Sequence, residues 1–125
     1  MMKVTPAIIE SDAQSILRRN CHSRIFKASF GISPYICAGV WNAMVDTQSL
    51  PQSAETKHML WTLLFLKVYA SESVLCTICA CDEKTLRKWV WMMLDEMAGL
   101  DVVSVYNLGL VLLAAARFLH LTILV

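Results

Sequence analysis

The sequence predicts an all-α fold: a compact multi-helix domain that contains a helix-turn-helix and ends in an apolar C-terminal helix. Three observations support this prediction. Apolar residues recur at three- and four-residue intervals, as one buried helical face requires. Two segments, Thr5-Pro6 and Ser33-Pro34, place a capping residue before a proline at the first helical position. No sustained alternation of period two and no Asn-Gly turn occurs, so the sequence gives no strand signal.

The order of the elements follows from the caps and the apolar periodicity. Thr5 and Ser33 are the expected caps of the first two helices, and Ser53 is the expected cap of the third. Residues 59–69 are apolar around almost the whole circumference of that third helix, so it should be the central and most buried element. The predicted helices cover residues 5–19, 34–46, 54–70, 72–79 and 83–98, with a further helix in the tail.

The last two of these helices, joined by a tight turn, match the spacing of a helix-turn-helix. Cys76 and Ala80 are small residues four positions apart. Leu86 and Trp89 are apolar and follow Ala80 by six and nine positions. We expect Ala80 at the turn because the chain passes close to a neighbour there and only a small residue fits. In the first helix of the pair, the side chains that should face inward are those of Leu75, Cys76 and Cys79.

In such a motif the second helix enters the major groove with its N-terminal residues near the base edges. Asp82 is the expected cap of this helix, where a carboxylate also suits the positive end of the helix dipole. Arginine and lysine suit phosphates and guanine edges, and threonine can donate or accept. The predicted DNA-binding residues are Lys84, Thr85, Arg87 and Lys88 on this helix, and Arg18, Arg19, Arg24 and Lys27 nearer the N-terminus. The alternative is an ordinary solvated helix face.

Charge is distributed unevenly along the 125 residues, although the net charge is only +1 and creates no strong overall field toward nucleic acid. Residues 1–31 carry five basic and two acidic side chains, whereas residues 32–101 carry five basic and eight acidic ones. We therefore divide the sequence into a basic N-terminal arm and helix (1–31), a helical domain with the helix-turn-helix (32–101) and an apolar tail (102–125).

The tail reads NLGLVLLAAARFLHLTILV from residue 107 and is long enough to be considered as a membrane span. Arg117 and His120 lie well inside it, and an arginine near mid-bilayer costs roughly 2.5–3.5 kcal/mol. We therefore expect a helix that packs on the core or meets a helical protein partner, not a span. The N-terminal residues lack the apolar region of a secretory signal, which predicts a nuclear or cytoplasmic protein rather than a secreted one.

The five cysteines permit two further interpretations. An odd number without a secretory signal favours reduced thiols. Cys21, beside several cations, resembles an activated thiol, but no general base accompanies it, so an exposed flexible segment is preferred. A zinc site is the second interpretation; its candidate ligands are Cys76, Cys79, Cys81, Cys37, His58 and His120. Because helical spacing places Cys76 and Cys79 on an apolar face, buried free thiols are favoured and no metal or cofactor is predicted.

Three segments of the chain carry a recognisable pattern. They are Phe-x-x-x-Phe-Gly-x-Ser over residues 26–33, Leu-Trp-x-Leu-x-Phe-Leu-Lys over 60–67 and Glu-Lys-Thr-x-Arg-Lys-Trp over 83–89. In this order they are similar to the N-terminal part of Harbinger-type DDE transposase-like nucleases, and the resemblance spans roughly residues 18–103. It implies a DNA-binding helical module.

In that family an RNase H-like domain follows, in which three acidic residues hold the metal ions that activate water. This sequence contains no Asp-Gly-Thr and no acidic residue after Asp101. We therefore expect a truncated module with an unrelated end, without the nuclease domain and without enzymatic activity. The alternatives are a helical protein-protein interaction module that uses Trp91, Met92 and the tail, or a non-functional remnant of a transposable element.

Overall fold

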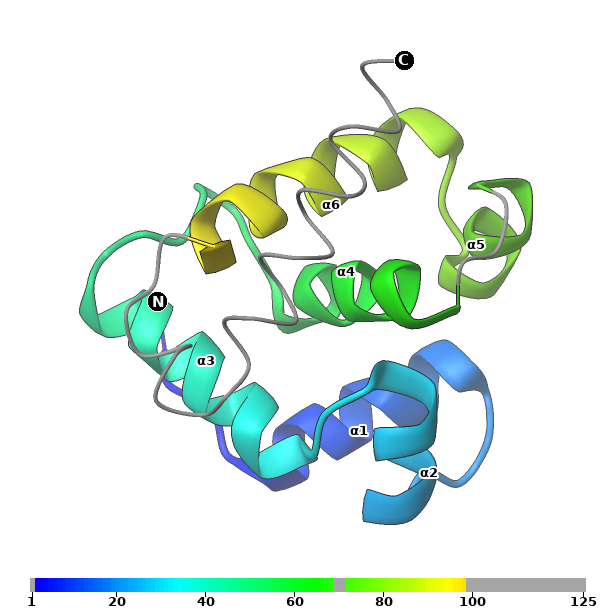
Figure 1. The fold of residues 1–125 in the computed structure, drawn as a ribbon, viewed down its shortest axis with the longest axis horizontal. Helices are drawn as coiled ribbons and strands as arrows, with labels where there is room; N and C mark the ends of the chain where they lie inside the picture. Colours follow the sequence, from blue (N-terminus) through cyan, green and yellow to red (C-terminus); the bar gives the residue numbers. More distant parts are fainter. Residues whose placement is uncertain (1, 69–71, 99–125) are drawn as a thin grey trace.

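The computed structural model describes residues 2–68 and 72–98, and these residues form α-helices without any β-strand (Figure 1). The predicted all-α fold is thus confirmed for the described part of the chain. The predicted helix of the apolar tail, at residues 102–125, lies outside it. The helices are α1 (Pro6–Leu17), α2 (Ser23–Phe30), α3 (Pro34–Asp46), α4 (Thr56–Val68), α5 (Glu72–Cys79) and α6 (Glu83–Ala98).

The two caps predicted before prolines are both confirmed. The Thr5 hydroxyl accepts a hydrogen bond from the Ile8 N–H at 3.4 Å, and α1 begins at Pro6. The Ser33 hydroxyl accepts from the Ile36 N–H at 3.2 Å, and α3 begins at Pro34. Each hydroxyl satisfies one of the N–H groups that a helix start leaves without an intrahelical partner.

Helix α2 was not among the predicted helices. It is an amphipathic helix of eight residues in which only Phe26 and Phe30 are buried, so its sequence shows no repeated apolar period. Phe26 and Phe30 are both buried, and their ring centroids lie 4.7 Å apart, as residues four positions apart on one helical face allow. Gly31 ends the helix with a left-handed φ of 87° and donates its N–H to the Lys27 carbonyl at 2.8 Å.

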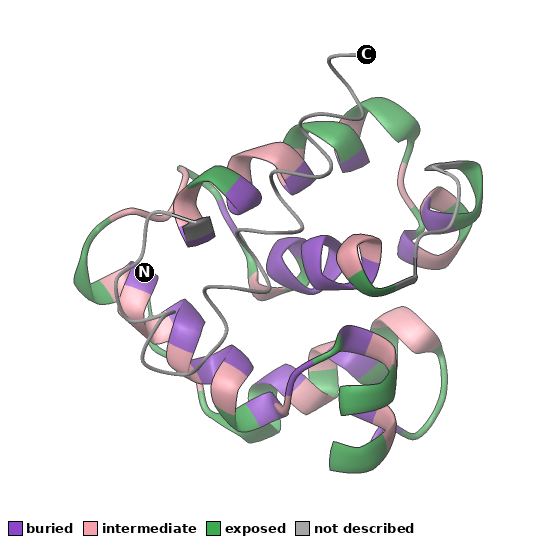
Figure 2. Ribbon diagram, viewed as in Figure 1, coloured by how far each residue is buried: buried purple, intermediate pink, exposed green. Residues whose placement is uncertain are grey.

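Helix α4 runs through the middle of the molecule, with α6 on one side and α1 and α2 on the other (Figure 1). Every residue from His58 to Leu64 is buried, as the colouring of α4 in Figure 2 shows. Among them is the polar Thr62, whose hydroxyl donates to the His58 carbonyl at 3.0 Å. The prediction that this helix is the central and most buried element is therefore confirmed. Its surroundings explain the nearly all-apolar sequence, because neighbours cover it on several sides.

The predicted cap of α4 was wrong. Ser53 lies before the helix in a left-handed conformation, with a φ of 67°, and α4 begins only at Thr56. Glu55 takes the capping position: its N–H donates to Nδ1 of His58 at 2.9 Å, while its carbonyl accepts from the His58 N–H at 3.0 Å. A side chain three residues into the helix thus reaches back to the residue before it, as glutamine or glutamate does in a capping box.

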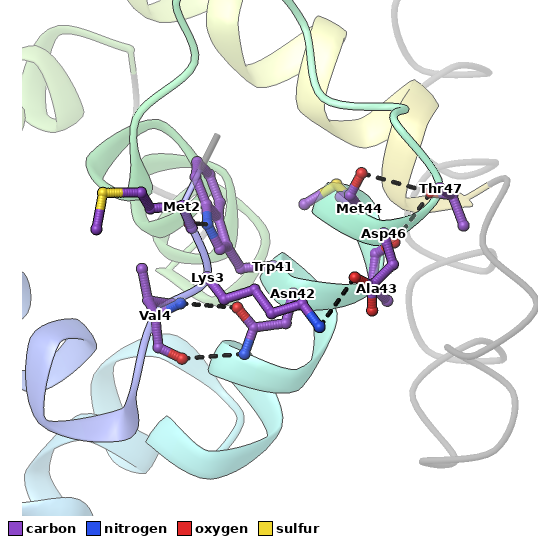
Figure 3. Close-up of polar contacts among 9 residues, drawn as sticks. All are labelled: Met2, Lys3, Val4, Trp41, Asn42, Ala43, Met44, Asp46 and Thr47. Carbon is purple, nitrogen blue, oxygen red and sulfur yellow. Dashed lines mark hydrogen bonds and ion pairs between the residues drawn. The ribbon is translucent and has the colours of Figure 1, made fainter.

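The N-terminal residues are fastened to α3 (Figure 3). The Asn42 side-chain amide accepts from the Val4 N–H at 2.8 Å and donates to the Val4 carbonyl at 2.9 Å. The Trp41 indole N–H donates to the Met2 carbonyl at 3.2 Å, and Lys3 forms an exposed ion pair with Asp46 at 3.0 Å. These contacts hold residues 2–4, which lead into α1, against α3. Helix α3 in turn packs along α1.

Candidate nucleic-acid interface

The short helix, tight turn and longer helix predicted between residues 72 and 98 are present as α5, residues 80–82 and α6. The Cys81 N–H donates to the Cys76 carbonyl at 3.2 Å, which closes the end of α5. The Asp82 carboxylate accepts from the Thr85 N–H at 3.2 Å and so caps α6 as predicted. Bonds from the Thr85 hydroxyl and then from its backbone N–H lower the pKa of Asp82.

Ala80 sits at this turn for a reason other than the one predicted. It is exposed, so no close neighbour restricts the size of its side chain. Its backbone is left-handed, with a φ of 55°, at the position after a helix where glycine is usual. This position in the turn therefore favours a residue that tolerates a left-handed backbone conformation.

Ala80→Gly is expected to raise the free energy of unfolding by about 0.5–1 kcal/mol. Relief of the left-handed strain, about 1–2 kcal/mol for a residue with a Cβ, outweighs the extra backbone entropy that glycine loses, about 0.4–1 kcal/mol. Urea unfolding followed by circular dichroism measures the change. Ala28→Gly, at an exposed position inside α2, is the control and should lower stability by roughly 0.5–1 kcal/mol. A destabilised Ala80→Gly protein would contradict the strain at this turn.

The predicted base-reading residues occupy the N-terminal half of α6. Lys84, Arg87 and Lys88 are exposed, and Nζ of Lys88 lies 5.3 Å from the centroid of the Trp89 ring. Thr85 is half-buried, and its hydroxyl donates a hydrogen bond to Asp82. The Glu83 carboxylate accepts from the Ser73 hydroxyl at 3.2 Å, which ties the start of α6 to α5. The three cations thus stand on a helix start that is fixed by two side-chain hydrogen bonds.

The opposite face of α6 packs into the core, as the sequence predicts. Leu86, Val90, Met93 and Met97 are at most 2% exposed. Trp89 is half-buried, and its ring stacks on the imidazole of His58 with centroids 3.8 Å apart and planes only 3° from parallel. This stack connects the middle of α6 to the start of α4.

His58 is the residue at this junction that sequence reasoning did not connect with the helix-turn-helix. Besides the Trp89 stack, its ring meets the edge of Trp61 at a centroid distance of 5.0 Å. Burial, reinforced by the positive charges of Lys57 and Lys88, lowers the pKa of His58 to about 4, against an opposing effect of Glu55. The neutral form also suits the hydrogen bond that Nδ1 accepts. A histidine three residues after Glu55, at a capping-box position, was the available signal.

The N-terminal cations reach the surface in two groups. Arg18 ends α1 in a left-handed conformation, with a φ of 56°, and Arg19 follows it. Arg24 and Lys27 lie on α2, which packs against α4, α1 and α3. All four side chains are exposed. Of the four, Arg18 lines a cleft that Thr85 of the helix-turn-helix also lines.

That cleft has a volume of about 510 Å³ and lies among the end of α1, the start of α4, the turn after α5 and the start of α6. Its polar lining includes Arg18 and Lys57, which carry positive charge, and Asp12, whose carboxylate accepts a hydrogen bond from Thr56. His58 and Trp61 also line it. Sequence reasoning missed Lys57, since nothing local indicates that residues so far apart in the chain share one cleft.

The five thiols are free and partly or fully buried. Cys21 was predicted to lie in an exposed flexible segment, but its side chain is fully buried beside α2, and burial raises its pKa. Burial also raises the pKa of Cys79 to about 12 and that of Cys81 to about 11. Within residues 2–68 and 72–98, no three histidine, cysteine or acidic side chains are arranged to hold a metal ion. His120, another proposed zinc ligand, lies outside these ranges.

Comparisons with protein-family models, curated proteins and solved structures gave no match to this chain. The similarity to Harbinger-type transposase-like nucleases therefore stays a prediction from the sequence segments. In the part of the chain that the structure describes, no helix is both long and apolar enough to cross a membrane. The tail considered as a span at residues 107–125 lies outside that part.

Proposed function

We propose that this chain is a DNA-binding helix-turn-helix module of transposase-like origin, with α6 as the recognition helix. The observation that carries the proposal is the placement of Lys84, Arg87 and Lys88 on the exposed N-terminal half of α6, directly after the turn. In helix-turn-helix proteins this part of the second helix meets the base edges of the major groove. The sequence segments that resemble transposase-like nucleases support the same proposal.

The arrangement of α5 and α6 gives further support. The turn is closed by the Cys81–Cys76 backbone bond, and α6 is anchored by five core residues and by the Trp89–His58 stack. A recognition helix held in this way loses little conformational entropy when it binds, because its backbone is already fixed. A protein-protein adaptor would instead use Trp91, Met92 and the tail. Trp91 and Met92 are half-buried, so the described residues give that alternative less support.

The test is the binding of a fluorescently labelled random duplex DNA, measured by anisotropy across a range of salt concentrations. With about four to six phosphate contacts, the affinity should fall roughly a hundred- to a thousandfold between about 50 and 200 mM salt, because each contact releases counterions. A peptide nucleic acid duplex, which has no phosphates, is the control and should show no such dependence. Absence of binding to the DNA duplex at the lowest salt would remove the proposed function.

A further inference from the structure

The cleft beside the helix-turn-helix has the size and the lining of a ligand site. Its volume of about 510 Å³ falls within the range of roughly 300–1,000 Å³ that is usual for sites of small organic ligands. Four helices contribute to it, so the fold itself fixes its shape. Its lining combines apolar side chains, Ile16, Trp61 and Ile78 among them, with charged side chains and hydroxyl groups.

The charges in this cleft favour an anion. Arg18 and Lys57 line it with one carboxylate, that of Asp12, which already accepts a hydrogen bond from the Thr56 hydroxyl. His58 adds no charge near neutral pH, because its pKa is lowered to about 4. The lining is therefore positive by one charge. Ser15 adds a hydroxyl donor at the same place.

Lys57 is positioned at the cleft without being committed to one partner. Its Nζ lies 5.7 Å from the centroid of the Trp61 ring, which keeps the side chain along the cleft wall. It also lies 3.4 Å from a carboxylate oxygen of Glu55, but both side chains are about half exposed, so water weakens this pair. A phosphate brought to the cleft would meet an ammonium group that can turn toward it.

We propose that this cleft is a phosphate-ester site in which Arg18 and Lys57 bind the phosphate oxygens. Arginine offers paired N–H donors for two oxygens, and lysine offers a compact positive charge. The space exceeds what a phosphate group fills, and the lining offers an attached sugar both apolar groups for its C–H bonds and hydroxyl groups for its own hydroxyls. The phosphate can belong to a DNA backbone that passes α6, a source that rests on the proposed function, or to a free sugar phosphate.

The DNA source is tested by the salt dependence of binding in Lys57→Gln and, as a matched control, in Lys67→Gln. Lys67 is an exposed lysine near the other end of α4 and does not line the cleft. Lys57→Gln should lose one phosphate contact, which reduces the slope of log affinity against log salt by about one. The reduction should be the same for every duplex sequence, and Lys67→Gln should keep the wild-type slope. Between about 50 and 200 mM salt the wild type should then lose about threefold more affinity than Lys57→Gln.

Binding of a free sugar phosphate is tested by titrating ribose 5-phosphate into the full chain and following the backbone amide NMR signals of Ser15 and Thr85. A site for free phosphate esters gives saturable shifts in the wild type and in Lys67→Gln, and none in Lys57→Gln. If the wild type binds no DNA, the proposed function fails and this titration alone decides the site. If the three proteins share one salt slope and no sugar phosphate shifts these signals, the phosphate site is overturned, whether or not DNA binds.

Discussion

Replacing Arg87 and Lys88 together by glutamate is expected to abolish sequence-specific DNA binding while the protein stays folded. Both side chains are exposed on the N-terminal half of α6, so the change leaves the buried face of the helix intact. Each contact of this kind to a base edge is worth about 1–3 kcal/mol, and the introduced carboxylates repel phosphates. The affinity for a duplex selected by the wild type from a random pool should fall at least about a hundredfold.

The control is the double charge reversal Arg24→Glu, Lys27→Glu, which changes the net charge by the same amount. These residues lie on α2, where contacts to the DNA backbone would carry no base information. This variant should weaken binding to all duplexes alike and keep the preference for the selected one. Circular dichroism verifies that both variants fold. Equal losses for the two variants, with no change in preference in either, would show that α6 does not read the bases.

Acid is expected to destabilise the protein through His58. The pKa of this residue is about 4 in the folded protein and about 6.5 in an unfolded chain, so between these pH values the unfolded state binds more protons. Its contribution to stability is therefore complete above about pH 6.5 and is lost as the pH falls toward 4. We expect the free energy of unfolding to drop by about 2 kcal/mol from this residue between pH 7.5 and 4.5, measured by urea unfolding.

His58→Gln isolates this contribution. Glutamine does not titrate, yet its carbonyl oxygen can still accept the Glu55 N–H that Nδ1 of the histidine accepts. The variant loses the stack on Trp89, so it should be less stable at neutral pH but should lose about 2 kcal/mol less on acidification. His22→Gln, at an exposed position before α2, serves as the control and should keep the wild-type acid dependence. An unchanged acid dependence in His58→Gln would refute the role of His58.

Sequence reasoning succeeded where one short segment determines the structure. The caps at Thr5, Ser33 and Asp82 each act on an N–H group three residues later, and all three were predicted correctly. The apolar face of α6 also follows from spacing alone. Burial of α4 was predictable because a helix that is apolar all round needs neighbours on several sides.

It failed where residues distant in the sequence set the outcome. Ser53 has the right residue type for a cap, but the start of α4 is fixed by His58, whose ring is held between Trp61 and Trp89. The phosphate-site residues Arg18 and Lys57 come from different helices, and their proximity depends on how α1 packs against α4. No local pattern encodes that packing, so Lys57 was not among the predicted DNA-binding residues.

The position of α4 also determines when the chain can fold during synthesis. Helices α1 and α2 bury apolar side chains against α4, which follows α3 by nine residues along the chain. A ribosome adds roughly 5–20 residues per second, so these helices are complete roughly 2–10 seconds before α4 is. During that interval Phe26 and Phe30 lack their main partner and offer an apolar surface to chaperones. A nascent chain arrested when residues 1–55 have left the ribosome should therefore be bound by chaperones, and one arrested after α4 has also left the ribosome should be released.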